Sequence, residues 1–115
     1  MYPINLITNK IARKELESYL NNPFTEMVKF VVDIEKGILA LGGELHSDAE
    51  LVLLEQGSAQ KNLWGGNVYP LKNGDDTLEF SSLINIRPSQ NNFSLDIKDK
   101  NLQAQIKDIV KKLLL

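Results

Sequence analysis

The stretch that decides the fold is residues 28–54, which read VKFVVDIEKGILALGGELHSDAELVLL. Hydrophobic residues alternate in its first part with the two-residue period of a strand, through Val28, Phe30, Val32 and Ile34. Residues 38–42 follow after a short turn, and the apolar side chains at successive positions there indicate a strand that is covered on both faces. Gly37 supplies the positive φ angle that the turn requires. The stretch therefore predicts an antiparallel β-hairpin.

A helix is expected directly after this hairpin, from Ser47 to about Gln56. Ser47 and Glu50 have the spacing of a capping box, in which each side chain accepts a hydrogen bond from the backbone N–H of the other. Asp48 adds a negative charge at the N-terminal end, where the helix dipole favours it. Gly57 suits the position that follows the last helical residue. Apolar residues cover most of the circumference, so we expect this helix to be deeply buried.

The rest of the chain predicts two more helices and three more strands. The helices are expected at residues 8–20 and from Asp99 onward, where a hydrophobic stripe repeats every three or four positions. The strands are expected at residues 67–71, 77–87 and 93–97. The element order α-ββ-α-βββ-α predicts an α+β fold, with a mainly antiparallel sheet of about five strands and three helices. At 115 residues, the chain fits a single domain, residues 1–115.

Charge and composition argue against several classes of protein. The chain has 13 basic and 15 acidic residues, a balance that makes nucleic-acid binding an unfavoured role. It has no cysteine, which excludes disulfides, thiolate metal sites and a cysteine nucleophile. No signal peptide or membrane-spanning run is present, so we expect a cytoplasmic protein without a membrane partner. The glycine-rich phosphate-binding patterns are also absent, and the sequence identifies no cofactor.

Four strings in the chain are distinctive as a set. They are VKFVVDIE at residues 28–35, GGELHSDAE at 42–50, LWGGN at 63–67 and SLINIRP at 82–88. Together they resemble a family of short uncharacterised bacterial proteins that is seen notably in cyanobacteria. The resemblance extends over residues 27–99 and implies a bacterial, single-domain protein. Because no activity is known for the family, the resemblance assigns no catalytic residue.

The first candidate site consists of Glu44, His46 and Asp48. Glu44 and His46 project to the same side if their segment is extended, and Asp48 returns toward them at the helix start. Carboxylates and an imidazole suit a divalent metal, or a carboxylate that orients His46 as a general base. A structural interpretation competes with both, because helix capping accounts for Asp48 and His46 can simply pack. No standard metal-binding spacing is present, and one histidine excludes a multi-histidine centre within a chain.

A second set of residues is predicted to bind a ligand, namely Trp64, Asn67, Tyr69 and Arg87. Trp64 lies in a glycine-rich segment, where an exposed indole would stack on a ligand and a buried one would close the core. Arg87 belongs to a polar row on an expected strand, where its guanidinium suits an anion. The same row is typical of the solvent face of an ordinary antiparallel strand.

Two functions from different classes follow from these residues. The favoured one is a small cytoplasmic binding or protein-interaction domain that self-associates as a homo-oligomer, because the catalytic inventory is incomplete and apolar residues occupy both faces of the hairpin. The alternative is a metal-assisted hydrolase or nuclease-like enzyme with a site around Glu44, His46 and Asp48. The sequence identifies neither a substrate nor a small-molecule ligand.

Overall fold

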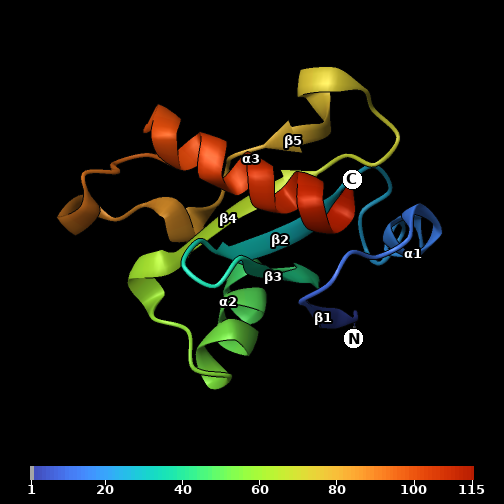
Figure 1. The fold of residues 1–115 in the computed structure, drawn as a ribbon, viewed down its shortest axis with the longest axis horizontal. Coiled ribbons are helices and arrows are strands. Elements are labelled where there is room, and N and C mark those ends of the chain that lie inside the picture. Colours follow the sequence, from blue (N-terminus) through green and yellow to red (C-terminus); the bar gives the residue numbers. More distant parts are fainter. Residues whose placement is uncertain (1) are drawn as a thin grey trace.

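A five-stranded antiparallel sheet organises the chain, as seen in a computed structural model that describes residues 2–115 (Figure 1). The strands have the spatial order β1-β3-β2-β4-β5. Their bounds are β1 Ile4–Ile7, β2 Val28–Asp33, β3 Ile38–Gly42, β4 Leu63–Val68 and β5 Leu78–Glu79. The three α-helices are α1 Arg13–Glu17, α2 His46–Glu55 and α3 Lys100–Leu114. This arrangement confirms the predicted α+β fold with a mainly antiparallel sheet and three helices.

The β2–β3 hairpin forms as the sequence predicts, and its turn is fixed by one carboxylate. Gly37 has φ +67°, the left-handed conformation expected for it. Asp33 Oδ1 accepts hydrogen bonds from the backbone N–H groups of Glu35 at 2.9 Å and Lys36 at 3.0 Å. Asp33 Oδ2 accepts a third bond, at 2.6 Å, from the hydroxyl of Ser58, which follows α2. One buried side chain therefore connects the hairpin to the segment after α2.

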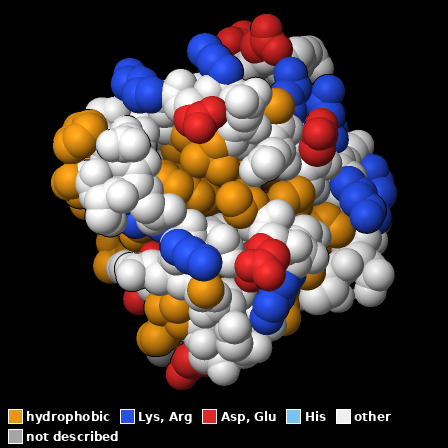
Figure 2. Space-filling model, turned by 60° about the vertical axis from the view of Figure 1, so that its left-hand side comes forward, with side chains coloured by type: hydrophobic (Ala, Val, Ile, Leu, Met, Phe, Trp, Pro, Cys, Tyr) orange, Lys and Arg blue, Asp and Glu red, His pale blue; other side chains and the backbone are white. Residues whose placement is uncertain are grey.

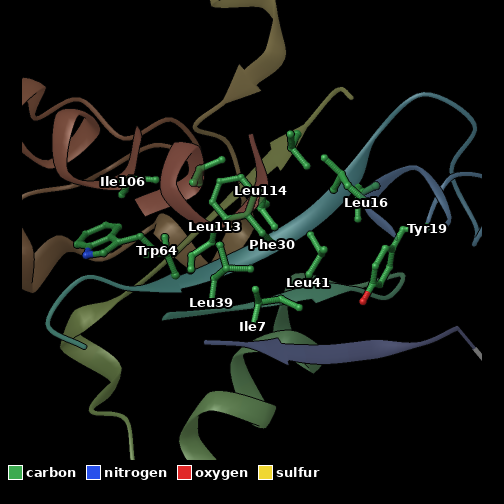
Figure 3. Packing of buried hydrophobic residues seen from close by; sticks show 14 of the residues in the cluster. Ile7, Leu16, Tyr19, Phe30, Leu39, Leu41, Trp64, Ile106, Leu113 and Leu114 are labelled. Atoms are coloured by element: carbon green, nitrogen blue, oxygen red, sulfur yellow. The ribbon is translucent and has the colours of Figure 1, made fainter. Parts of the chain in front are cut away.

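Helices cover both faces of the sheet, with α3 on one side and α2 on the other (Figure 1). Phe30, Leu39 and Leu41 face α3 and pack there against its buried residues Ile106, Leu113 and Leu114 (Figure 3). Val31 and Ala40 point to the opposite face, where Ala49 and Leu53 of α2 cover them. Successive residues of β2 and β3 are thus buried on alternate sides, which confirms the expectation that this hairpin is central.

The start of α2 corrects the expected capping box. The residue at the N-cap is Leu45, which has no capping side chain, and the helix begins at His46. Ser47 therefore lies in the first turn, where its side chain is exposed and no longer precedes the helix. A long-range contact sets this start, because the buried imidazole of His46 bonds to the backbone of β4.

The burial of α2 is also shallower than expected. Only His46, Ala49 and Leu53 are buried, at the spacing of a single helical face. Leu51 is 52% exposed and Leu54 is 37% exposed. The expectation of deep burial was wrong, because no layer lies outside α2 in the described residues 2–115 to cover its outer face.

Several other boundaries differ from the sequence pattern. Residues 4–7 form β1, an edge strand paired with β3, where no strand was predicted. The first helix is shorter than residues 8–20, and β4 begins at Leu63, so the tryptophan–glycine segment is a strand. The expected strands at 77–87 and 93–97 reduce to β5 and two isolated bridges. Helix α3 begins where predicted, with Asp99 accepting from the N–H groups of Asn101 and Leu102.

Two asparagine side chains explain why residues 80–97 do not form strands. The amide of Asn85 accepts from Gly65 N–H and donates to Gly65 C=O, both at 2.9 Å, as a neighbouring strand would. Asn92 Nδ2 donates to three backbone carbonyls of its own segment, those of Asn85, Ser94 and Asp96. Side chains therefore satisfy backbone groups that a ladder of strands would otherwise pair. None of the helices in this described part is long and apolar enough to cross a membrane.

The two faces of α2 give a matched test of the fold. Replacing Leu53 by alanine empties a fully buried position between α2 and the sheet. We expect it to lower the free energy of unfolding by about 2–5 kcal/mol, measured by urea denaturation. The control is Leu51→Ala, on the exposed face of the same helix, which should change stability by no more than about 0.5 kcal/mol. Equal effects of the two substitutions would contradict the orientation of α2.

Candidate functional site

The candidate site is a hollow between the start of α2, β4 and residues 81–84, with a volume of about 360 Å³. We name it the His46 hollow. Its buried polar side chains are His46, Asn67 and Ser82. Its rim includes three exposed hydrophobic residues, Leu45, Leu83 and Leu95. A concave site with an apolar border and a few fixed polar groups is the usual form of a ligand pocket.

His46 is held at the hollow by its place in α2 and by one hydrogen bond. As the first residue of α2 it faces the sheet, and only 8% of it is exposed. Its Nε2 lies 2.8 Å from the carbonyl oxygen of Gly66. A carbonyl only accepts, so Nε2 carries a proton, and in the neutral ring Nδ1 carries the lone pair.

Gly65 provides the space that the imidazole occupies. A Cβ atom at this position would lie 2.8 Å from Ser82 Oγ and 3.2 Å from His46 Cδ2. Any side chain would therefore displace one of these two groups from the strand. The absence of a side chain in β4 allows both polar residues to lie directly on the sheet.

Burial is the main influence on the charge of His46, and it lowers the pKa of the imidazole below its ordinary value of 6.5. Lys29, which lines the same hollow, lowers this pKa further. The Gly66 carbonyl, the Asn67 side chain and Glu79 favour the charged form, but the net direction is downward. At neutral pH the ring is therefore uncharged, with a lone pair on Nδ1 that can accept a hydrogen bond or a proton.

Asn67 has an amide whose orientation is fixed and whose oxygen lacks a partner. Its Nδ2 donates to Glu79 Oε1 at 2.7 Å and to the Ser81 carbonyl at 3.3 Å. Rotating the amide by 180° would place its oxygen against two acceptors, so Oδ1 is the atom that remains free. Oδ1 is buried, and no group among residues 2–115 donates a hydrogen bond to it. A buried acceptor without a donor is costly in free energy, and the two bonds that Nδ2 donates hold the amide in this orientation.

The other residues of the first candidate site lie elsewhere. Glu44 and Asp48 line a separate hollow of about 790 Å³, together with Tyr2, Ile4 and Gly43 near β1. The helix begins at His46, so the extended geometry that would have placed Glu44 and His46 on one side does not continue to Asp48. Across residues 2–115, no three histidine, aspartate or glutamate side chains are grouped to hold a metal ion. The metal-assisted hydrolase stays a prediction of the sequence that this arrangement does not support.

Of the predicted ligand-binding residues, only Asn67 lines the His46 hollow. Tyr69 donates its hydroxyl to Glu79 Oε1 at 3.2 Å, on the exposed side of β4 and β5. Trp64 is 3% exposed and belongs to the core cluster beneath α3 (Figure 3). Its ring also borders a hollow near the start of α3. On this side of the molecule, hydrophobic side chains gather in the middle of the surface and charged side chains surround them (Figure 2).

Arg87 is engaged by the protein itself. Its guanidinium carbon lies 4.1 Å from the centre of the Trp64 ring. The guanidinium donates to the side-chain oxygen of Gln90 and to the backbone carbonyls of Gln60, Leu63 and Ile84. Because the guanidinium already donates four hydrogen bonds, it has little capacity left to bind an anion. Its stack on Trp64 fixes residues 84–90 against β4.

Sequence reasoning named His46 and Asn67 but missed what brings them together. Ser82, Gly65 and Gly66 were not among the predicted site residues. The signal was present, because two adjacent glycines inside an otherwise strand-like segment indicate a close approach by another part of the chain. Which part approaches depends on contacts across 20 residues, and no local pattern specifies it.

Comparison with known proteins gives one match. A protein-family model described as "Protein of unknown function (DUF5674)" matches residues 5–113. No curated protein and no solved structure matches the chain.

The protonation of His46 gives a direct test of the site. We expect nuclear magnetic resonance of the only histidine in the chain to give a pKa below 6.5. Because folding lowers this pKa, the unfolded chain binds the proton more readily. The contribution of His46 to stability is complete above the unfolded pKa, falls as the pH drops below it, and becomes constant below the folded pKa.

His46→Gln provides the control. Subtracting the pH dependence of its stability from that of the unaltered chain removes the contribution of the carboxylates and leaves that of the imidazole. A pKa at or above 6.5 would show that the ring is not buried as described.

Arg87 can be tested through the only tryptophan of the chain. Arg87→Lys loses the planar fork and the stack, and we expect it to destabilise the fold by about 1–3 kcal/mol. Unfolding followed by Trp64 fluorescence measures this loss and also reports a changed environment of the indole. Gln90→Ala removes just one acceptor of Arg87 and should have a smaller effect. If Arg87→Lys has the stability of the unaltered chain, these hydrogen bonds make no net contribution to the free energy of unfolding.

Proposed function

The chain belongs to the DUF5674 family of proteins of unknown function, and we propose that it is a small binding domain. The proposal rests on the geometry of the chain, because the family description gives no activity. The His46 hollow is its site. The observation that carries this proposal is the group of three buried polar side chains, His46, Asn67 and Ser82, that line a hollow with an apolar rim.

The polar groups of the hollow are rigidly positioned, as a binding site requires. His46 is fixed by Gly66, and Asn67 is fixed by Glu79 and the Ser81 carbonyl. Ser82 Oγ accepts from the N–H of Ile84 at 3.3 Å, which orients the third polar side chain. A ligand meeting these groups would not need to order them first, so less binding free energy would be lost on association.

The rim supports binding of a compound or segment with an apolar part. Leu83 is 76% exposed, although a large aliphatic side chain at this position has no structural reason to face water. Leu45 and Leu95 lie at the same hollow and are also exposed. Covering these three side chains would supply the hydrophobic part of the affinity.

The proposal includes self-association, for which α2 offers a surface. Leu51 and Leu54 are exposed on its outer face, where a second copy would remove them from water. The bacterial origin and the cytoplasmic location stay predictions of the sequence.

A fragment screen tests the binding site. Small aromatic compounds added to the ¹⁵N-labelled protein are expected to shift amide signals of residues 45–47, 67 and 81–84. Leu83→Ser should weaken these shifts severalfold without a loss of stability, because the side chain is already exposed. Leu71→Ser is the matched control, since Leu71 is 66% exposed but lies outside the hollow. Shifts that ignore Leu83→Ser, or that avoid the hollow altogether, would refute the site.

Light scattering coupled to size exclusion tests self-association. We expect a species larger than the 13.0 kDa chain at high protein concentration. The double substitution Leu51→Ser and Leu54→Ser should return it to the monomer. A strict monomer for the unaltered chain at every concentration would count against this part of the proposal.

A further inference from the structure

We propose that a hollow between α3 and β5 binds a small amphiphilic anion, a molecule with one carboxylate on an apolar body. This hollow has a volume of about 570 Å³, within the usual range for ligand pockets, and lies where α3 passes beside β5 (Figure 1). We name it the α3–β5 hollow. It is a different site from the His46 hollow, because the two share no lining residue.

The sheet side of the α3–β5 hollow is apolar and within reach of a ligand. Leu78 begins β5 and Phe80 directly follows this strand, so the two side chains project to the same face, toward α3. Both pack against the main core but are only partly buried. An occupant would therefore cover hydrophobic surface that the protein itself leaves partly open to water, and this would stabilise the complex.

The helix side of the α3–β5 hollow is basic. Lys100, Lys107 and Lys111 all line it, because positions seven and four residues apart lie on one stripe of an α-helix. Ala104 lies on the same stripe between Lys100 and Lys107, and its small side chain leaves room for a ligand between these lysines. The hollow thus has a positive border on a chain whose formal net charge is −2.

These lysines have little negative charge to balance them. Among residues 2–115, Asp75 is the single acidic side chain that lines the hollow. Its carboxylate is fully exposed and lies 3.8 Å from Lys107 Nζ, so this ion pair is weak. Lys100 and Lys111 form no ion pair within the same described range. A carboxylate in the hollow would supply the missing partner, whereas a cation would meet three ammonium groups.

The two walls together define the ligand. A purely apolar molecule would gain nothing from the lysines, and a simple anion such as acetate would leave Leu78 and Phe80 uncovered. The C-terminal end of a helix carries partial negative charge, so the carboxylate is expected nearer to Lys100 and Lys107 than to Lys111. The apolar body then lies against β5.

Matched probes test this inference on the full chain. Cinnamate has both features, cinnamamide has the same body without the charge, and acetate has the charge without the body. In titrations followed by ¹⁵N–¹H spectra, cinnamate is expected to shift amide signals of residues 77–78, 80, 103–104 and 107. Its dissociation constant should be at least about threefold lower than that of cinnamamide, and sodium chloride at about 0.5 M should reduce the difference. Acetate at the same concentration should leave these signals unshifted.

Substitutions of exposed residues separate the two walls without unfolding the chain. Lys107→Gln should weaken cinnamate binding about two- to fivefold and leave cinnamamide unchanged. Ala104→Leu keeps a good helix former but fills the space between the lysines, so it should weaken both probes. Asp75→Asn removes the competing carboxylate and should strengthen cinnamate binding about twofold. Lys112→Gln is the matched control, because Lys112 is exposed on α3 but does not line the hollow.

Several outcomes would overturn this inference. Equal affinities for cinnamate and cinnamamide would do so, as would cinnamate binding that Lys107→Gln and Ala104→Leu leave unchanged, or no shift at millimolar cinnamate. Shifts confined to residues 45–47, 67 and 81–84 would place the probe in the His46 hollow, which supports the proposed function and contradicts this second site. Sedimentation of the protein with phosphatidylglycerol vesicles, without any shift by cinnamate, would mean that the lysines contact a lipid surface instead.

Discussion

The structure depends on two adjacent positions in β4 that have no side chain. At Gly65, the face toward α2 is open, and His46 and Ser82 lie against the strand there. At Gly66, the face toward α3 is open, and a Cβ atom would lie 2.5 Å from Cζ of the Phe30 ring. Phe30 is among the largest fully buried side chains, so this gap accommodates the centre of the main core. One dipeptide thus admits a polar group on one face of the sheet and an aromatic ring on the other.

The polar side of this arrangement links the fold to the candidate site. The contact between His46 and the Gly66 carbonyl sets where α2 begins, and it also fixes which imidazole nitrogen carries the proton. The same strand continues to Asn67, whose amide is oriented by Glu79 on β5. His46 and Asn67 therefore lie on a helix and a strand, while residues 81–84 and Leu95 complete the hollow from the irregular segment after β5. Positions held in this way retain their geometry in the absence of a ligand.

Local patterns were sufficient for the parts of the fold that local interactions determine. The alternation in residues 28–34, the turn at Gly37 and the cap at Asp99 each depend on neighbours within a few residues. The start of α2 and the absence of strands after β5 depend on His46 and Asn85, which bond to residues 20 positions away. The same difference between local and long-range determinants applies to the candidate site. Two of its residue types were chemically suggestive in the sequence, but only the tertiary fold decides that Asn67 joins His46 and that Glu44 does not.

The amide of Asn85 also determines how the sheet ends. A sheet that grows by taking strands from other copies needs a free edge at both ends. Beyond the two residues of β5, Asn85 occupies the N–H and C=O of Gly65, so this part of the β4 edge is closed to a foreign strand. At the opposite end, the sheet order stops at β1. Strand addition through β1 would join two copies, whereas the Gly65 part of the β4 edge is closed to a further strand.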